Sequence, residues 1–97
     1  MASFISTIKF TQQGLGSIQE TTKRSAGIKS LGKKLGVKVT NVYWTLGAYD
    51  GVLIFEAADD ESATAFLLAV AQAGNVHTET VRAFTAAEMD KILAMGK

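Results

Sequence analysis

The run YWTLGAYDG at residues 43–51 holds the groups of this chain that are best suited to chemistry. We predict that Tyr43 and Asp50 lie on one face of a two-stranded hairpin, among apolar neighbours. A carboxylate in such surroundings is either held ionised by hydrogen-bond donors or acts as a base. The alternative is structural: Asp50 hydrogen-bonds the turn and Tyr43 packs at an interface.

His77 is the only histidine, and it shares strand parity with Glu79, so a histidine–carboxylate pair is one hypothesis. A metal site normally needs three or more protein ligands, so we predict no metal here unless copies of the chain complete one. The alternative places His77 at the surface or at an interface.

Arg24 lies four residues before Ile28 and seven before Leu31, on the apolar stripe of a predicted helix. Its guanidinium would then point toward the sheet, as a clamp for an anion or a carboxylate. In the alternative its stem covers apolar surface, while its head reaches water or pairs with an acid.

Composition excludes several classes of protein. Ninety-seven residues make a single domain over 1–97, and the absence of cysteine excludes disulfides and thiolate chemistry. A net charge of +1, with lysines spread around the helix, argues against nucleic acid as a partner. No apolar run approaches the roughly 20 residues that span a bilayer, and no signal peptide is evident, so we expect a soluble cytoplasmic protein. Nucleotide and zinc-protease motifs are absent, and we predict no cofactor.

Hydrophobic periodicity predicts the elements that must position these groups. Alternating or β-branched runs predict strands, and apolar spacings of three and four predict helices. Gly47-Ala48 is typical of a two-residue type II′ turn, and Thr85 to Glu88 reads as a capping box that opens a last helix. The predicted strands are 3–10, 37–46, 50–57 and 76–84, and the predicted helices are 17–35, 60–73 and one beginning after Thr85. This order predicts an α+β, ferredoxin-like βαββαβ fold with a C-terminal helix and a four-stranded antiparallel sheet.

Both faces of the predicted hairpin carry large apolar groups. The assumed turn pairs Leu46 with Tyr49, Trp44 with Gly51 and Val42 with Leu53 on one face, and leaves Tyr43, Val52 and Ile54 on the other. Helices cover one face of such a sheet, so the second needs another cover, and a second copy of the sheet is the simplest. We therefore expect a homodimer or a larger homo-oligomer. In the alternative, Val52 and Ile54 are tolerated surface residues.

The chain resembles the GYD domain family over nearly its whole length. The resemblance rests on TQQG at 11–14, YWTLGAYD at 43–50, FEAADDE at 55–61 and NVHTETVRAFT at 75–85, with Gly47, Tyr49 and Asp50 as the naming motif. It implies membership of the dimeric α+β barrel group, in which two such sheets pack face to face. This chain has Gly51 where the family usually has a bulky residue, so either the Trp44 ring folds over the glycine or a cavity opens beside it.

Three functions follow as hypotheses. The first is a homo-oligomeric ligand-binding or sensing module with a pocket lined by Tyr43, Trp44, Asp50 and Arg24. The second is a cofactor-independent oxygenase or isomerase-like enzyme acting on a small aromatic or carbonyl compound, with Asp50 or His77 moving protons. The third is a purely structural oligomer.

Overall fold

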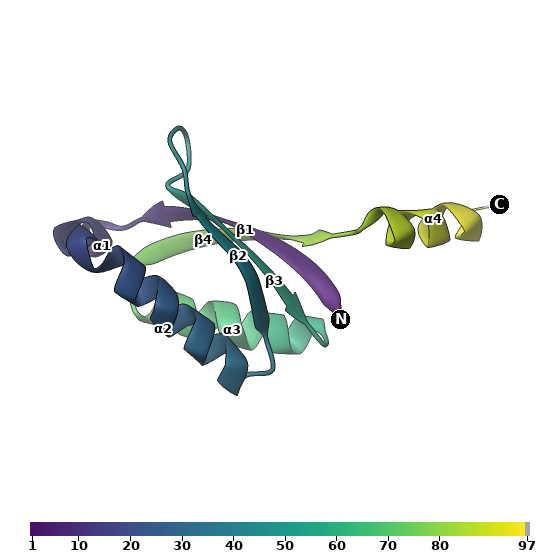
Figure 1. Ribbon diagram of the computed structural model, residues 1–97, viewed down its shortest axis with the longest axis horizontal. Helices are drawn as coiled ribbons and strands as arrows, with labels where there is room; N and C mark the ends of the chain where they lie inside the picture. The colour runs from purple at the N-terminus through teal and green to yellow at the C-terminus, as the bar shows by residue number, and fades with distance from the viewer. Residues whose placement is uncertain (97) are drawn as a thin grey trace.

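A computed structural model of the chain, which describes residues 1–96, shows one antiparallel sheet with helices on a single face (Figure 1). The four strands follow the order β2-β3-β1-β4 across the sheet. The elements are β1 (Ala2–Phe10), α1 (Gln12–Gly16), the 3₁₀ turn η1 (Ile18–Glu20), α2 (Thr21–Lys34), β2 (Lys38–Trp44), β3 (Gly51–Ala57), α3 (Asp60–Gln72), β4 (Val76–Ala83) and α4 (Ala86–Met95). This is the predicted ferredoxin-like α+β fold with a C-terminal helix.

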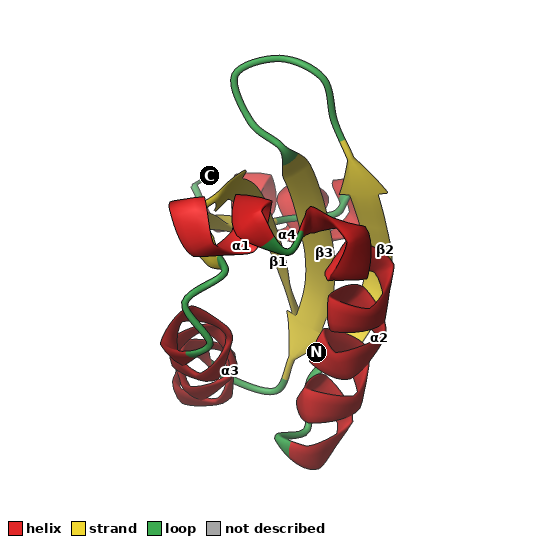
Figure 2. Cartoon of the chain, turned by 90° about the vertical axis from the view of Figure 1, so that its left-hand side faces the viewer, coloured by secondary structure: helices red, strands yellow, loops and turns green. Residues whose placement is uncertain are grey.

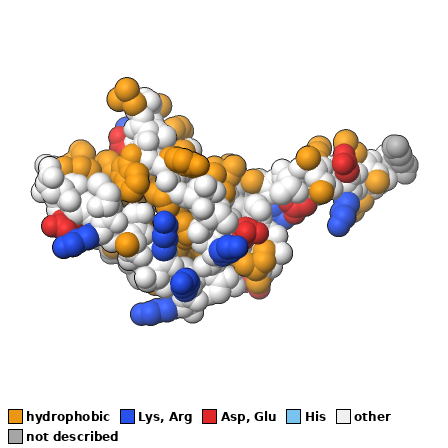
Figure 3. Space-filling model, viewed as in Figure 1, with side chains coloured by type: hydrophobic (Ala, Val, Ile, Leu, Met, Phe, Trp, Pro, Cys, Tyr) orange, Lys and Arg blue, Asp and Glu red, His pale blue; other side chains and the backbone are white. Residues whose placement is uncertain are grey.

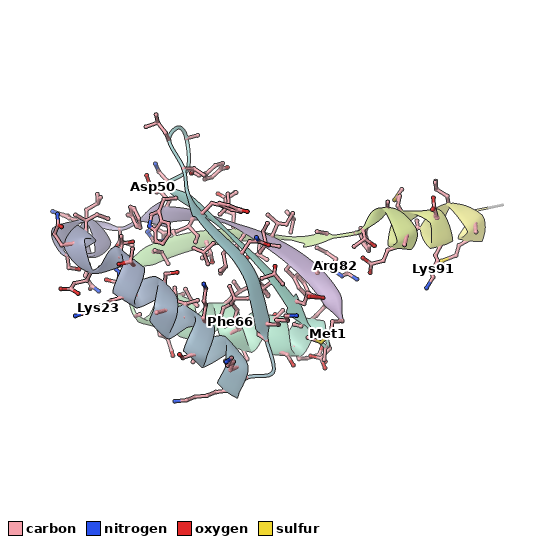
Figure 4. The ribbon with its side chains drawn as sticks, viewed as in Figure 1. Met1, Lys23, Asp50, Phe66, Arg82 and Lys91 are labelled. Carbon is pink, nitrogen blue, oxygen red and sulfur yellow. The ribbon has the colours of Figure 1, made fainter. Side chains whose placement is uncertain are left out.

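The core lies between the sheet and the pair α2 and α3, which run beneath it (Figures 1 and 2). Phe55 in the middle of β3 stacks on Phe4 of β1, with ring centroids 5.3 Å apart. Phe66 of α3 meets Phe55 edge-on at 5.1 Å, pointing from its helix toward the sheet (Figure 4). Such aromatic pairs add to the free energy gained by burying their surface. The central strands are therefore fixed to α3 by three rings.

The one buried polar side chain among the described residues, Ser6 of β1, is satisfied within the sheet. Its hydroxyl hydrogen-bonds that of Thr80 on β4. Because an unpaired buried hydroxyl is destabilising, this bond also fixes the pairing of β4 on β1.

The predicted helix 17–35 differs from the structure in its first part. A separate short helix, α1, precedes it, Ile18–Glu20 form the 3₁₀ turn η1, and α2 begins only at Thr21. Thr11 caps α1 by accepting from the Gly14 N–H, at 3.0 Å. Gly14 packs so closely on the Asn75 backbone that a Cβ there would lie 2.1 Å from the Asn75 carbonyl oxygen. A contact so distant in sequence is not visible in local periodicity. The other helix ends follow the predicted signals, with Gly36 at φ +74°, an Asp59 N-cap and the Thr85–Glu88 capping box.

The hairpin between β2 and β3 was predicted correctly in register and wrongly in its turn. Trp44 pairs with Gly51 and Val42 with Leu53, as expected. The connection is longer than two residues, however, and its last paired groups are the Thr45 N–H and the Asp50 carbonyl, 2.9 Å apart. The loop extends beyond the strands, and there Leu46 and Tyr49 are exposed instead of adding to the core (Figure 2). The edge strand β2 also carries a β-bulge between Val39 and Asn41.

Two glycines of α2 should respond oppositely to substitution. A Cβ at Gly32 would lie 2.9 Å from the Val37 carbonyl oxygen, whereas a Cβ at Gly27 meets nothing within 4 Å. We expect Gly32→Ala to lower the free energy of unfolding by about 1–3 kcal/mol through this overlap. Gly27→Ala should raise it by up to about 1 kcal/mol, because alanine is the better helix former. Urea denaturation of both variants measures this, and two variants of equal stability would show that α2 does not need the close approach at Gly32.

Two helix caps predict an acid-sensitive stability. The Ser62 backbone N–H lowers the pKa of the Asp59 carboxyl, and the Thr85 backbone N–H lowers the pKa of Glu88. A pKa lowered by folding stabilises the fold above the unfolded-state pKa, and this stabilisation is lost as the pH falls through the folded-state value. The urea midpoint should therefore fall below about pH 4.5. It should fall less steeply in the double variant Asp59→Asn, Glu88→Gln, and parallel curves for parent and variant would refute the assignment.

Candidate functional site

A pocket of about 240 Å³ opens between the sheet and the helices α2 and α3. Most of its wall is apolar, and small residues from both helices and from β3 leave the space. Its lining residues are Ile8, Phe10, Thr21, Arg24, Ser25, Gly27, Ile28, Leu31, Val42, Tyr43, Trp44, Asp50, Gly51, Leu53, Ala69, Val70, Ala73, Asn75 and Val76. Four of the five residues predicted to bind a ligand are in this set, and His77 is not.

Trp44 connects the end of β2 to the start of α2. Its indole Nε1–H donates to the Thr21 hydroxyl at 3.0 Å. Gly51, its partner across the hairpin, has no room for a side chain, because a Cβ there would lie 2.9 Å from the Tyr43 carbonyl oxygen. Of the two outcomes expected at Gly51, the structure shows the cavity, since Gly51 and Trp44 both line the pocket.

Asp50 has a structural task at the rim of the pocket, near the base of the hairpin loop (Figure 4). Its backbone N–H donates to the Ile8 carbonyl and its Oδ2 accepts from the Phe10 N–H, each at 2.8 Å. The carboxylate thus satisfies a strand-end donor of β1, whereas the structural alternative expected it to hydrogen-bond the turn. A carboxylate that serves one backbone N–H keeps acceptor capacity for a ligand.

Tyr43 and Asp50 both contribute to the pocket lining, but each side chain has a hydrogen-bond partner elsewhere. The Tyr43 hydroxyl accepts from the Asn41 amide at 3.2 Å, and the Tyr43 side chain is 55% exposed. No hydrogen bond joins Tyr43 to Asp50 within residues 1–96, because Asp50 lies in the loop before β3 and its carboxylate turns toward β1.

Arg24 lines the pocket, and its guanidinium already donates hydrogen bonds within the chain. Its guanidinium donates to the Ser17 carbonyl at 2.8 Å, to the Ser17 hydroxyl at 2.9 Å and to the Gly14 carbonyl at 3.2 Å. These bonds satisfy carbonyls at the end of α1. A guanidinium has five N–H groups, so two remain for other acceptors.

His77 lies away from the pocket. It is exposed on β4, opposite Lys9 in the register, and its parity places it on the face that no helix covers. In the part of the chain that the structure describes, no three histidine, aspartate or glutamate residues gather as a metal could require. His77 and Glu79 share the uncovered face, as their parity predicted, and the ion pairs among residues 1–96 do not include them.

The sequence interpretation missed three polar lining residues, Thr21, Ser25 and Asn75. Asn75 follows Gly74, which has a φ of +80°, and its carbonyl accepts from the Thr11 N–H at 3.0 Å. The Gly-Asn pair signalled a helix end, but its contact with Thr11 depends on tertiary structure. Thr21 and Ser25 lie four apart, which is one helical face, and this spacing was the available signal.

Comparison with known proteins places these features in context. The family model for the GYD domain matches residues 4–93. A protein of Thermus thermophilus, named "Glutamine synthetase and cystathionine beta-lyase binding protein", is 30% identical over 90 residues, which are 92% of this chain and 95% of the relative.

Two solved structures share the fold. The crystal structure of MtbAldR has a TM-score of 0.66 and 18% identity over 87% of this chain, which spans about half (52%) of that chain. The crystal structure of TTHA0845 from Thermus thermophilus has a TM-score of 0.58 and 23% identity, over 89% of this chain and 96% of that one. Separately, no helix within residues 1–96 is both long and apolar enough to cross a lipid bilayer.

The role of Asp50 can be tested by two substitutions that differ in acceptor capacity. Asp50→Asn keeps a carbonyl oxygen for the Phe10 N–H and should leave the free energy of unfolding nearly unchanged. Asp50→Ala leaves that donor unpaired and should lower it by about 1–3 kcal/mol. Urea denaturation compares the two, and equal stability of the alanine variant and the parent would remove Asp50 from the structural framework.

Proposed function

This chain belongs to the GYD domain family, and from that premise we propose that it is a homo-oligomeric binding module that holds a small, mainly apolar molecule between its sheet and its helices. The observation that carries this is the pocket itself, with apolar walls and a few polar groups. Small-molecule sites have this make-up, because apolar walls supply affinity and a few polar groups fix orientation. The volume of about 240 Å³ limits the ligand to one ring or a short chain.

The polar groups at the pocket indicate what the ligand should carry. Arg24 has two N–H groups free of protein acceptors, Asp50 has a carboxylate oxygen beyond the one bound to Phe10, and the Thr21 hydroxyl can donate while it accepts from Trp44. A ligand with one hydrogen-bonding head on an apolar body would meet both parts of this lining.

Self-association is supported by the uncovered face of the sheet. One row across the four strands runs Asn41, Ile54, Ile5 and Val81, and the next runs Tyr43, Val52, Thr7 and Glu79. Val81 is 61% exposed. A second copy would cover the apolar residues of these rows, as the sheet-to-sheet pairing of dimeric α+β barrels does.

A second candidate function is docking on an enzyme, and the Thermus relative's name favours it. In this chain Leu68 is 61% exposed on α3, next to the exposed Ala65 on the side away from the core. Binding of glutamine synthetase or of cystathionine β-lyase by the purified protein, lost in Leu68→Lys, would support this second function.

Trp44 provides a direct test of the pocket, because it is the single tryptophan of the chain and lies in the lining. Cyclohexanol and cyclohexanecarboxylate absorb little near-ultraviolet light, and we expect saturable shifts of Trp44 emission with at least one of them. Ala69→Leu places extra carbons in the lining and should weaken that binding by about tenfold or more. Isothermal titration calorimetry gives an independent dissociation constant.

Ala71→Leu is the matched control, since Ala71 is exposed on the same helix and does not line the pocket. It should bind the probe as the parent does. A native mass spectrum of protein purified from its own host would then report the retained molecule. Equal loss of binding in both leucine variants, or no saturable shift with either probe, would overturn the pocket as a binding site. Turnover of a bound carbonyl compound would instead favour the enzyme hypothesis.

A further inference from the structure

The C-terminal helix α4 stands apart from the body of its own chain. It projects past the end of the sheet, and none of its residues is buried against the rest of residues 1–96 (Figure 1). Met89, Ile92 and Leu93 nevertheless form an apolar stripe at spacings of three and four, and Leu93 is 58% exposed. Figure 3 shows hydrophobic side chains along the projecting helix. An isolated helix of ten residues is only marginally stable in water, so this stripe needs a partner.

The junction with β4 directs α4 away from its own core. The Thr85–Glu88 capping box fixes the first turn, and Arg82 Nη2 lies 3.7 Å from Glu88 Oε2 (Figure 4). Arg82 in turn donates to the Ser3 carbonyl at 3.2 Å, and its guanidinium lies over the Phe84 ring at 4.5 Å. These contacts join the start of α4 to the ends of β1 and β4. Of these contacts, the Arg82–Glu88 ion pair would be lost if α4 folded back over its own sheet.

The size of the uncovered sheet face indicates why a dimer interface would include α4. Strands about 4.8 Å apart that rise about 3.3 Å per residue give four strands of some seven residues a face of roughly 450 Å². A stable interface buries about 800 Å² of accessible surface on each partner. Only part of the uncovered face is apolar, because the row that begins with Tyr43 and Val52 continues into Thr7 and Glu79. The next exposed apolar surface along the chain is α4.

We propose that α4 is an interaction arm: its apolar stripe packs on a second copy of this chain, which packs its own α4 in return. In a two-fold contact each copy supplies the same surfaces, so one arm per chain completes two contacts. A net charge of +1 leaves little repulsion between copies. This inference rests on the self-association proposed above and adds the element that completes it.

Photo-crosslinking of the purified protein tests the arm directly. With p-benzoylphenylalanine in place of Leu93, irradiation should give a product of twice the chain mass. The same group in place of Lys91, on the opposite side of α4, should give little, and it serves as the matched control. A Leu93 product of single-chain mass, or no product, would overturn the proposal, since the stripe would then contact its own chain or solvent.

Sedimentation equilibrium separates failure of the arm from failure of self-association. Ile92→Glu with Leu93→Glu should raise the dimer dissociation constant by about tenfold or more, because two buried apolar side chains are lost from each arm. Lys91→Glu should leave it unchanged. If the double variant dimerises as well as the parent does, the proposed role of α4 is overturned and the pairing of sheets is retained. A monomeric parent at about 50 μM would overturn both, whereas the fluorescence of Trp44 tests the pocket in either case.

Discussion

A four-stranded sheet has two faces, and in this chain the helices that pack on it all lie on one. The remaining features of the molecule depend on that constraint. On the covered face, the packed rings of Phe4, Phe55 and Phe66 hold the central strands to α3. On the other face, side chains such as Ile5 and Val81 have nothing of their own chain above them. Stability is concentrated on one side and the capacity for contact on the other.

The covered layer is itself divided between filled and open space. Around Phe55 large side chains interdigitate, whereas the pocket lies where Gly27, Gly51, Ala69 and Ala73 contribute almost no side-chain volume. Gly51 cannot be enlarged without moving the backbone of β2, since a Cβ would meet the Tyr43 carbonyl. The close approach of β2 thus keeps this part of the pocket lining free of a side chain. Trp44 completes it by its bond to Thr21, which ties the sheet to the first residue of α2.

Much of this could be predicted from the sequence because it is encoded locally. Alternating apolar residues predicted the strands, and the Thr85–Glu88 capping box predicted the start of α4. The predicted pairing of Trp44 with Gly51 fixed the register of the hairpin. The errors involve contacts that hydrophobic periodicity does not report. The Asp50 carboxylate accepts from β1, 40 residues away, and Arg24 donates to carbonyls at the end of α1, seven and ten residues away, so the hairpin turn and the anion clamp differ from their local signals. Four of the pocket residues were predicted from the sequence. The hydroxyl groups of Thr21 and Ser25 on α2 were not, because their place in the lining depends on how α2 packs on the sheet.

The β-bulge in β2 has a consequence for how copies of the chain can meet. β2 is an edge strand, and an edge with an unbroken row of free N–H and carbonyl groups invites another strand to extend the sheet without limit. The irregularity between Val39 and Asn41 interrupts that row and twists the edge. Growth by strand addition, the route to fibrils, is thereby disfavoured at β2. At this edge, contact through the face of the sheet is favoured over strand addition, and two-fold face contacts close on themselves after a fixed number of subunits.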